Sequence, residues 1–279
     1  MSFVHITVAN KQHPALLLLR QSAKAVSLET RVLGMGNTQK IGHGHGFGLK
    51  LTLMKKEMEV LPPEQFVLFT DAFDVLFQSS PSLQALHSFL TAHDKTVVFA
   101  AELSNWPDLV TYPSMIFPFP YLNSGVYAGR AKDILALLQQ PFDAKTDDQR
   151  YFVQQYLKQE SLPHVKIHID HGAEFFVCLE SVPKTAILYD TKPMTIALPS
   201  ASKATLPFVL HLNHGRTRIA LLKRLATRIL GTEVEPIAHA AVGQELWGIR
   251  YLLHTYRIKS NTLLLVLLLV AFATVLFVS

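Results

Sequence analysis

Two carboxylates directly follow an apolar, strand-like run near residue 70. Residues 67–70 read Val-Leu-Phe-Thr and lead into Asp71 and Asp74, which are spaced i, i+3. In open α/β folds, ligands bind at the carboxyl ends of strands. Two acidic side chains at such a point suit a hard divalent cation, and a divalent cation suits a diphosphate. The alternative is an ordinary turn, since Asp is common in turns for its local hydrogen bonds.

Two later strand-like runs also end in polar side chains that could share a site. Residues 99–101 lead into Glu102, with Trp106 shortly after it, and residues 209–210 lead into His211. An imidazole combined with carboxylates suits Mn²⁺ better than Ca²⁺, and a Trp beside a proline in a loop can line a pocket. His211 and Trp106 each have a structural alternative, because a single His is more often structural and a Trp can belong to the core.

Two further clusters combine polar residues with backbone freedom or a helix start. Asn123 stands just before Gly125, where a glycine lets the backbone approach a ligand closely, although an ordinary turn would look the same. Asp147 and Asp148 stand at a predicted helix start, where acids commonly cap the helix or interact with its dipole. Placed over a pocket, one of them could orient an acceptor hydroxyl or act as a base.

Strand-like and helix-like segments alternate in the first part of the chain, which predicts an α/β fold with a mostly parallel, covered sheet. Strands are expected over residues 3–9, 29–33, 66–70, 96–101 and 122–129. Helices are expected over residues 14–25 and 49–60, from the Ser80-Pro81 pair onward, and over 148–158. The glycine-rich segment 34–48 and the proline-rich segment 112–120 are expected to be loops.

Charge divides the chain into two regions. Residues 1–215 hold eighteen basic and eighteen acidic side chains, whereas residues 216–259 hold eight basic and three acidic ones. The main region therefore has no net charge, which argues against a nucleic-acid-binding protein. The single cysteine, Cys178, excludes an internal disulfide framework and fits a reducing compartment.

The segment 262–279 is apolar and carries no charge. As a helix it would extend about 27 Å, near the lower limit for crossing a bilayer core; a buried helix is the alternative. Arg250, Arg257 and Lys259 precede it and no basic residue follows. The positive-inside tendency therefore predicts a single-pass tail anchor with the N-terminal region in the cytoplasm.

Six motifs occur in a fixed order: VLFTDAFDVLF, FAAELSNWP, YLNSGVYAG, DDQRYF, IHIDH and HLNHG. In this order they resemble the glycosyltransferase domain of the procollagen lysyl hydroxylases and related collagen glycosyltransferases. The resemblance implies a GT-A fold, a Rossmann-like sheet that binds a UDP-sugar through Mn²⁺, with Mg²⁺ as the alternative ion. Residues 1–218 would form this domain, residues 219–260 a basic helical juxtamembrane region with surface or interfacial helices, and residues 261–279 the transmembrane helix.

The same resemblance implies roles for individual residues. Asp71, Asp74 and His211 match the family's metal ligands, and Asp147 and Asp148 match an acidic pair near the transferred sugar. Residues expected near the donor are Val8 and Gly34 at the uridine, Lys50 near the nucleotide, Trp106 at the sugar, and Asn213 and Gly215 at the diphosphate. Asn123 is expected to hold a sugar hydroxyl or the acceptor together with Asp148.

The match has one departure in its last motif, where the family pattern H-G-N-G is replaced by HLNHG. The extra residue makes His214 a second candidate for the imidazole ligand. His43 and His45, in the glycine-rich loop, have no counterpart with a role in this interpretation.

The function implied is transfer of a hexose, glucose or galactose, from a UDP-sugar to a hydroxyl acceptor that the sequence does not identify. Two alternatives use the same residues. A metal-dependent phosphohydrolase also clusters Asp at strand ends and would release phosphate without an acceptor. A membrane-anchored binding protein could hold the UDP-sugar without turnover.

Overall fold

The computed structural model describes residues 3–39, 46–108, 110–112, 118–161, 165–179, 182, 187–188, 193–196, 204–213 and 219–231. The strands of its central sheet are β1 Val4–Val8, β2 Thr30–Leu33, β3 Phe66–Thr70, β5 Thr96–Glu102, β6 Tyr121–Arg130 and β7 Lys166–Ile169. They pair in the order β2-β1-β3-β6-β5-β7. Every pairing in this sheet is parallel except those of β6, which runs antiparallel to both β3 and β5. The predicted α/β fold with a mostly parallel sheet is therefore confirmed.

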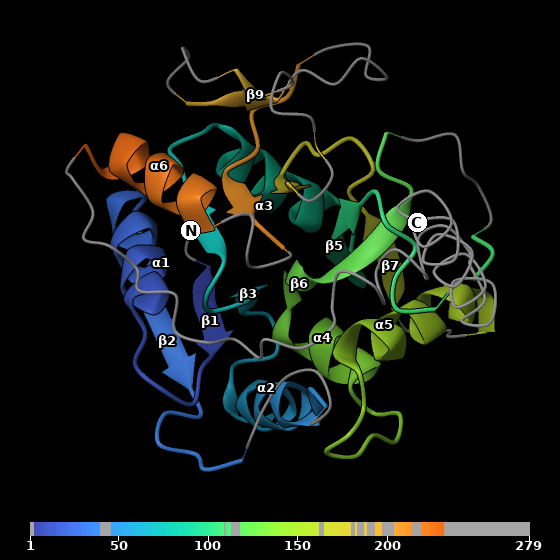
Figure 1. Cartoon of the computed structure of the whole chain (residues 1–279). Helices are drawn as coiled ribbons and strands as arrows, with labels where there is room; N and C mark the ends of the chain where they lie inside the picture. The colour runs from blue at the N-terminus through green and yellow to red at the C-terminus, as the bar shows by residue number, and fades with distance from the viewer. Residues whose placement is uncertain are drawn as a thin grey trace, which may run out of the picture. The chain divides into compact units, whose positions relative to one another are not determined.

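Helices cover both faces of this sheet, as its apolar strands require (Figure 1). They are α1 Pro14–Ala25, α2 Gly48–Val60, α3 Ser82–Ala92, α4 Ala131–Leu137 and α5 Asp148–Leu157, followed by a 3-10 turn at Gln159–Ser161. Buried residues of α2, α4 and α5 pack with one set of alternating strand residues. Buried residues of α3 pack with the other set, and those of α1 are divided between the two sets. The alternation of side chains along each strand thus supplies two apolar faces to one sheet.

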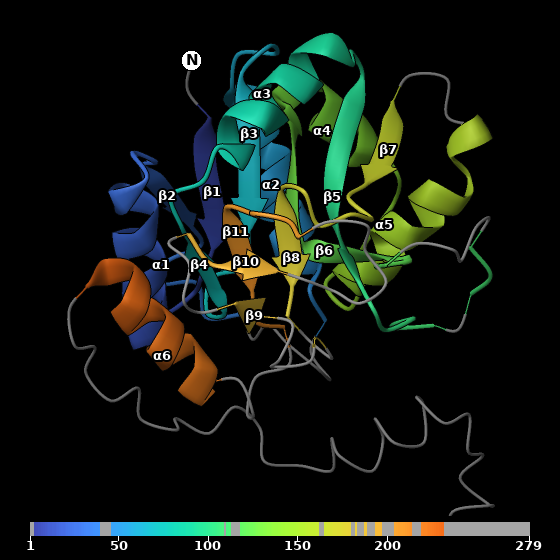
Figure 2. The ribbon, with the colours of Figure 1, turned by 90° about the horizontal axis from the view of Figure 1, so that it is seen from above.

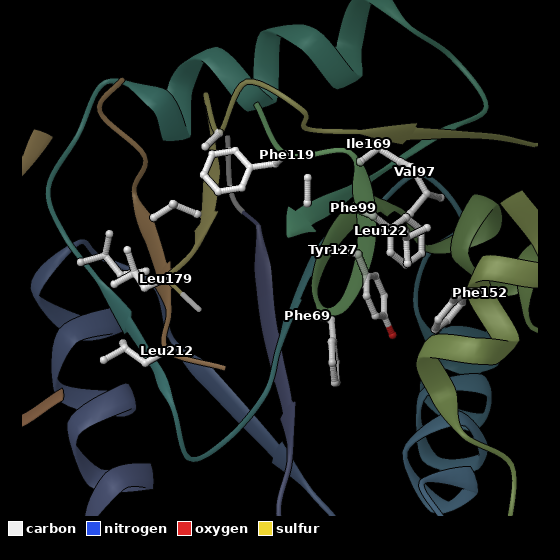
Figure 3. Packing of buried hydrophobic residues seen from close by; sticks show 14 of the residues in the cluster. Phe69, Val97, Phe99, Phe119, Leu122, Tyr127, Phe152, Ile169, Leu179 and Leu212 are labelled. Carbon is white, nitrogen blue, oxygen red and sulfur yellow. The ribbon is translucent and has the colours of Figure 1, made fainter. Parts of the chain in front are cut away.

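An aromatic cluster fills the side of the sheet that faces α5 (Figure 3). The ring of Tyr127 stacks on Phe69 at 4.7 Å and on Phe99 at 5.0 Å between centroids. Phe152, from α5, lies 5.0 Å from Phe99 and 5.4 Å from Tyr127. Because Phe69, Tyr127 and Phe99 come from the adjacent strands β3, β6 and β5, the cluster joins these strands to α5, whose first turn contains one of the predicted site residues.

A second, three-stranded sheet lies beside the first. It consists of β4 Val75–Phe77, β8 Phe176–Cys178 and β11 Val209–His211, in the order β4-β11-β8. The central strand β11 runs antiparallel to β4 and parallel to β8. A short antiparallel pair, β9 Ile187–Leu188 and β10 Thr195–Ile196, completes the described strands.

The last described helix, α6 Ile219–Leu230, contacts α1 and β4 (Figure 2). Its side chains Leu225 and Ala226 are fully buried in the main core, so this helix packs as part of the unit formed by residues 1–237. Within the described ranges, no helix combines the length and apolar composition needed to cross a membrane. The predicted segment 261–279 and most of the predicted region 219–260 lie outside those ranges.

Candidate metal centre

An imidazole from a distant part of the sequence meets two neighbouring carboxylates just beyond the carboxyl end of β3. The Nε2 atom of His211 lies 3.8 Å from Oδ2 of Asp71 and 3.6 Å from Oδ2 of Asp74. One possible ligand atom from each residue lies within 4.8 Å of the others. Two carboxylates and one imidazole at this spacing form a donor set that could hold a divalent metal ion.

The chain topology explains this convergence. Residues 71–74 connect β3 of the central sheet to β4 of the second sheet. Asp71 directly follows β3, and Asp74 directly precedes β4. Strand β11 pairs with β4 in the register that sets His211 opposite Val75, next to Asp74. The backbone N–H of Leu212 donates to the carbonyl of Asp74 at 2.7 Å. His211 is therefore fixed beside Asp74 by backbone pairing and does not depend on a flexible loop.

His211 is almost completely buried, and its Nε2 atom has no hydrogen-bond partner among the described residues. The 3.6 Å separation from Asp74 is longer than a good hydrogen bond. Burial lowers the pKa of His211, but the negative charges of Asp74, Asp71 and Glu102 outweigh burial and raise the pKa above its ordinary value. A buried ring nitrogen facing two carboxylates without a partner fits a site for a cation, which would satisfy all three groups.

The backbone of β6 approaches the three side chains closely at Gly125. A β-carbon at this position would lie 2.2 Å from Cε1 of His211 and 2.9 Å from Oδ2 of Asp71. The amide of Asp71 donates to the carbonyl of Gly125 at 2.7 Å. The pairing of β6 with β5 shifts register between Phe99 and Ala100, opposite this stretch. Such irregularities are common next to functional sites, where they redirect the backbone.

Lys50, in the first turn of α2, connects the metal candidates to the acidic pair. Its Nζ atom lies 2.7 Å from Oδ1 of Asp71 and 2.6 Å from Oδ2 of Asp148. It also lies over the ring of Phe47, 5.2 Å from the centroid. Burial lowers the pKa of Lys50, but the two carboxylates outweigh burial and raise the pKa above its ordinary value. Lys50 is therefore a charged side chain held between two acids.

The two residues of the acidic pair have different surroundings. Asp148 is buried in the first turn of α5 and accepts a hydrogen bond from Oγ of Ser124 at 3.3 Å. Asp147 caps the helix, since its Oδ1 accepts from the backbone N–H of Arg150 at 2.9 Å. Burial raises the pKa of Asp147, and the neighbouring carboxylate of Asp148 adds to this effect. The structure thus turns only Asp148 of this pair toward Lys50.

A buried polar network lies next to the metal candidates and is centred on Glu102, at the end of β5. Its carboxylate accepts from the amides of Asn123 at 3.1 Å, Gln149 at 2.5 Å and Asn213 at 2.7 Å. The Oδ1 atom of Asn123 in turn accepts from the backbone N–H of Gly125 at 2.9 Å. The network therefore holds the close-approaching segment of β6 in place.

The residues expected at the uridine lie together at the ends of β1 and β2. Val8 pairs with Leu33, which precedes Gly34. Gly34 has a φ of +83°, and a β-carbon there would lie 2.8 Å from Cδ1 of Leu53 and 3.8 Å from Cγ1 of Val8. A glycine is therefore favoured at this position by both conformation and space. Trp106 lies in the loop after β5, where its carbonyl accepts from Nε2 of Gln149 at 2.8 Å.

A family model described as the PLOD GT domain matches residues 1–229. The chain belongs to this family. The human protein named procollagen-lysine,2-oxoglutarate 5-dioxygenase 2 is 33% identical over 192 residues, which cover 66% of this chain and 26% of that protein. The rat multifunctional procollagen lysine hydroxylase and glycosyltransferase LH3 is 30% identical over 226 residues, or 77% of this chain and 30% of that protein. The chain thus spans less than a third of the length of these relatives.

One solved structure, a glycosyltransferase involved in glycosylation of the major capsid of PBCV-1, covers 78% of the chain. It shares 10% sequence identity with this chain at a TM-score of 0.46. Membership of the PLOD GT domain family therefore rests on the sequence match.

Some predicted site residues of this PLOD GT domain fall outside the described residues. They are Gly215, the second imidazole candidate His214, and the unassigned His43 and His45. Their roles stay predictions. The remaining candidates lie within the described part. Val8 and Gly34 lie at the ends of β1 and β2, and Asn213 and Trp106 lie around the Glu102 network.

Three residues at or behind this PLOD GT domain site have no role predicted from the sequence. Glu102 is predicted only as a carboxylate at the end of a strand, whereas in the structure it accepts three side-chain hydrogen bonds. Gln149 follows the acidic pair directly, which was the one available signal. Cys178 had no signal, because its contact with His211 depends on the pairing of β8 with β11.

Proposed function

We propose that this chain is a metal-dependent glycosyltransferase of the GT-A type that transfers a hexose, glucose or galactose, from a UDP-sugar to a hydroxyl acceptor. The observation that carries this proposal is the convergence of Asp71, Asp74 and His211 within a domain of the PLOD GT family. The proposal concerns the chemistry of this domain alone, because the chain matches 26–30% of the length of the relatives named above.

The donor would lie along the carboxyl ends of the parallel strands. Val8 and Gly34 would hold the uridine, and the diphosphate would lie toward the three metal candidates, where Asn213 and Gly215 are expected to contact it. Mn²⁺, or Mg²⁺ in its place, would act as a Lewis acid that stabilises negative charge on the departing UDP. This arrangement follows the general tendency of α/β folds to bind ligands at this edge.

The side chains on the sugar side supply positioning and charge. Lys50 holds Asp71 and Asp148 at hydrogen-bond distance and adds a buried positive charge beside the expected diphosphate. Asp148 would orient a sugar hydroxyl or the acceptor, and Trp106 would line the sugar pocket. Fixed orientation of the reacting groups accounts for a large part of the rate in group transfer.

Asn123 and Asp147 have more restricted roles in this proposal. The amide of Asn123 donates to Glu102 and Gln149, and its oxygen accepts from the backbone of Gly125. Its side chain is therefore held by the protein, which suits a residue that positions β6 more than one that releases these bonds to bind a sugar. Asp147 already caps α5, so it would act through the placement of Asp148.

The experiment is incubation of the full chain with Mn²⁺ and a panel of nucleotide sugars, with assays for free UDP, free phosphate and bound nucleotide. We expect metal-dependent release of UDP from UDP-glucose or UDP-galactose. Release of inorganic phosphate would indicate a phosphohydrolase, and binding without release would indicate a protein without turnover. Either of these results would contradict the proposal.

A further inference from the structure

The two ring nitrogens of His211 have different surroundings. Nε2 faces the carboxylates of Asp71 and Asp74 and has no hydrogen-bond partner among the described residues. Nδ1 lies 3.5 Å from Sγ of Cys178, within hydrogen-bond range for a sulfur atom. The orientation of the ring therefore depends on a contact that lies on the side away from the metal candidates.

Backbone pairing fixes this contact. His211 and Cys178 are register partners in the parallel pairing of β11 with β8, so their side chains stand next to each other on one face. The amide of Leu179 donates to the carbonyl of His211 at 2.7 Å, which holds the two strands together at this point. Both side chains are buried, so bulk water does not compete for the contact between the thiol and the ring.

The position of the imidazole proton decides what this contact does. A neutral imidazole carries one proton, and a ring nitrogen binds a metal only through its free lone pair. If Nε2 faces the cation, the proton must be on Nδ1, and the N–H then donates to the sulfur of Cys178. If the thiol instead donates to Nδ1, the ring proton is on Nε2 and points toward the carboxylates, which blocks metal binding. Hydrogen bonds of this kind orient metal-binding histidines in general.

We propose that Cys178 is a positioning residue that accepts the Nδ1–H bond of His211 and so presents the Nε2 lone pair to a divalent cation held with Asp71 and Asp74. This inference rests on the metal site of the proposed function and adds to it a residue outside the ligand set. Sulfur is a weak acceptor compared with a carboxylate or carbonyl oxygen. The contribution of Cys178 to metal affinity is therefore at the lower end of the range of about 10- to 100-fold for such partners.

The test measures the affinity of the full chain for Mn²⁺ alone by calorimetry. Cys178→Ala removes the acceptor, and we expect it to raise the dissociation constant about tenfold. Cys178→Ser keeps an acceptor of similar size, and we expect it to restore the affinity to within about threefold of the wild type. Val177→Ala is a matched control, because Val177 is equally buried in β8 but packs in the opposite core cluster. We expect no change in its Mn²⁺ affinity.

A second measurement follows the ring itself. ¹⁵N chemical shifts of the His211 ring report which nitrogen carries the proton, and we expect protonated Nδ1 and unprotonated Nε2 in the Mg²⁺-bound wild type. In Cys178→Ala this preference should weaken. If Cys178→Ala is too unstable to measure, the comparison of Cys178→Ser with Cys178→Val serves the same purpose, with weaker binding expected only for the valine.

The outcomes separate this inference from the function on which it rests. Folded Cys178→Ala with wild-type affinity, beside His211→Ala with strongly weakened affinity, would overturn the role of Cys178 and leave the metal site standing. A wild-type chain that does not bind Mn²⁺ would overturn the metal site and the inference together. Weaker binding in Cys178→Ala, rescued by serine, supports the inference.

Discussion

Among the single residues of the site, Asp71 uses its two carboxylate oxygens for different partners. Asp71 directs Oδ1 to Lys50 and Oδ2 toward His211. The DAFD phrase made both acids visible in the sequence, since two acids after an apolar strand are a local pattern. The partners of these acids were less visible, because Lys50 precedes Asp71 by 21 residues and His211 follows it from another sheet.

We predict that Asp71→Asn abolishes metal-dependent UDP-sugar turnover and leaves the fold intact. Asparagine keeps the shape of the side chain and an oxygen for Lys50, but it loses the negative charge that a cation requires. A bound metal ion stabilises the transition state by several kcal/mol, so we expect a loss of at least about 100-fold. The measurement is UDP release, with Asp94→Asn as control, because Asp94 is an exposed acid paired with Arg130. Turnover within threefold of the wild type would show that Asp71 holds no metal.

We predict that Gly125→Ala weakens Mn²⁺ binding, because the added methyl group would overlap Cε1 of His211 at 2.2 Å. His211 or the strand must shift, and overpacking of this kind typically costs about 1–3 kcal/mol of stability. The measurements are Mn²⁺ affinity and the free energy of unfolding. Gly172→Ala is the control, since the nearest contact of its methyl group would be the flexible side chain of Glu174 at 3.2 Å. Unchanged affinity in Gly125→Ala would contradict the described packing of β6 against the site.

At the scale of elements, local patterns predicted the first half of the fold well. Helix α1 has the predicted bounds, and β1, β2, β3 and β5 lie within one residue of them. The helix predicted to begin at Pro81 begins one residue later, at Ser82, and the Ser80 hydroxyl accepts from the amide of Ser82 at 3.2 Å. The antiparallel direction of β6 and the second sheet were missed. Strand direction is set by tertiary pairing, and a strand of three residues such as β8 has too little periodicity to be recognised.

The strand β1 provides a prediction about pH. The ring of His5 is buried between the hydroxyls of Thr30 and Thr70, each at 2.9 Å, and burial lowers the pKa of His5 from 6.5 to about 3. Because His5 binds a proton more readily in the unfolded chain than in the folded one, acid favours unfolding. The stability that neutral His5 contributes is therefore fully present above pH 6.5 and is lost as pH falls toward 3. One such group accounts for about 1.4 kcal/mol per pH unit, or about 2 kcal/mol between pH 6.5 and 5.

We therefore expect His5→Gln to lower stability at pH 7.5 but to lose less stability than the wild type on acidification to pH 5. The measurement is the free energy of unfolding in denaturant at the two pH values. His168, whose pKa burial lowers to about 4, titrates in both proteins and cancels in the comparison. Equal pH dependence of the two proteins would contradict the described burial of His5.

At the scale of the whole molecule, the chain combines a PLOD GT domain with an apolar C-terminal segment. We propose that residues 261–279 anchor the protein in a membrane, with the domain on the cytoplasmic side. The basis is the uncharged segment and the three basic residues before it, Arg250, Arg257 and Lys259. A membrane anchor would place the acceptor near a membrane surface.

We predict that the full chain remains in the membrane pellet after alkaline carbonate extraction, whereas a variant ending at Ser260 appears in the supernatant. The apolar segment is the reason, because burying its side chains in lipid opposes extraction. The charge-neutral substitution of Leu264 and Leu267 by alanine is a control that keeps the length and should leave the protein in the pellet. Full-length protein in the supernatant would contradict the anchor.

We propose that Asp71, Asp74 and His211 together hold one divalent cation. The most direct measurement is anomalous diffraction at the manganese absorption edge from crystals grown with Mn²⁺ and UDP. We predict one strong peak between the three side chains, within about 2.0–2.6 Å of an oxygen of each carboxylate and of Nε2 of the histidine. A bound UDP whose manganese peak lies away from His211, or the absence of a peak at these residues in crystals that contain Mn²⁺ elsewhere, would contradict it.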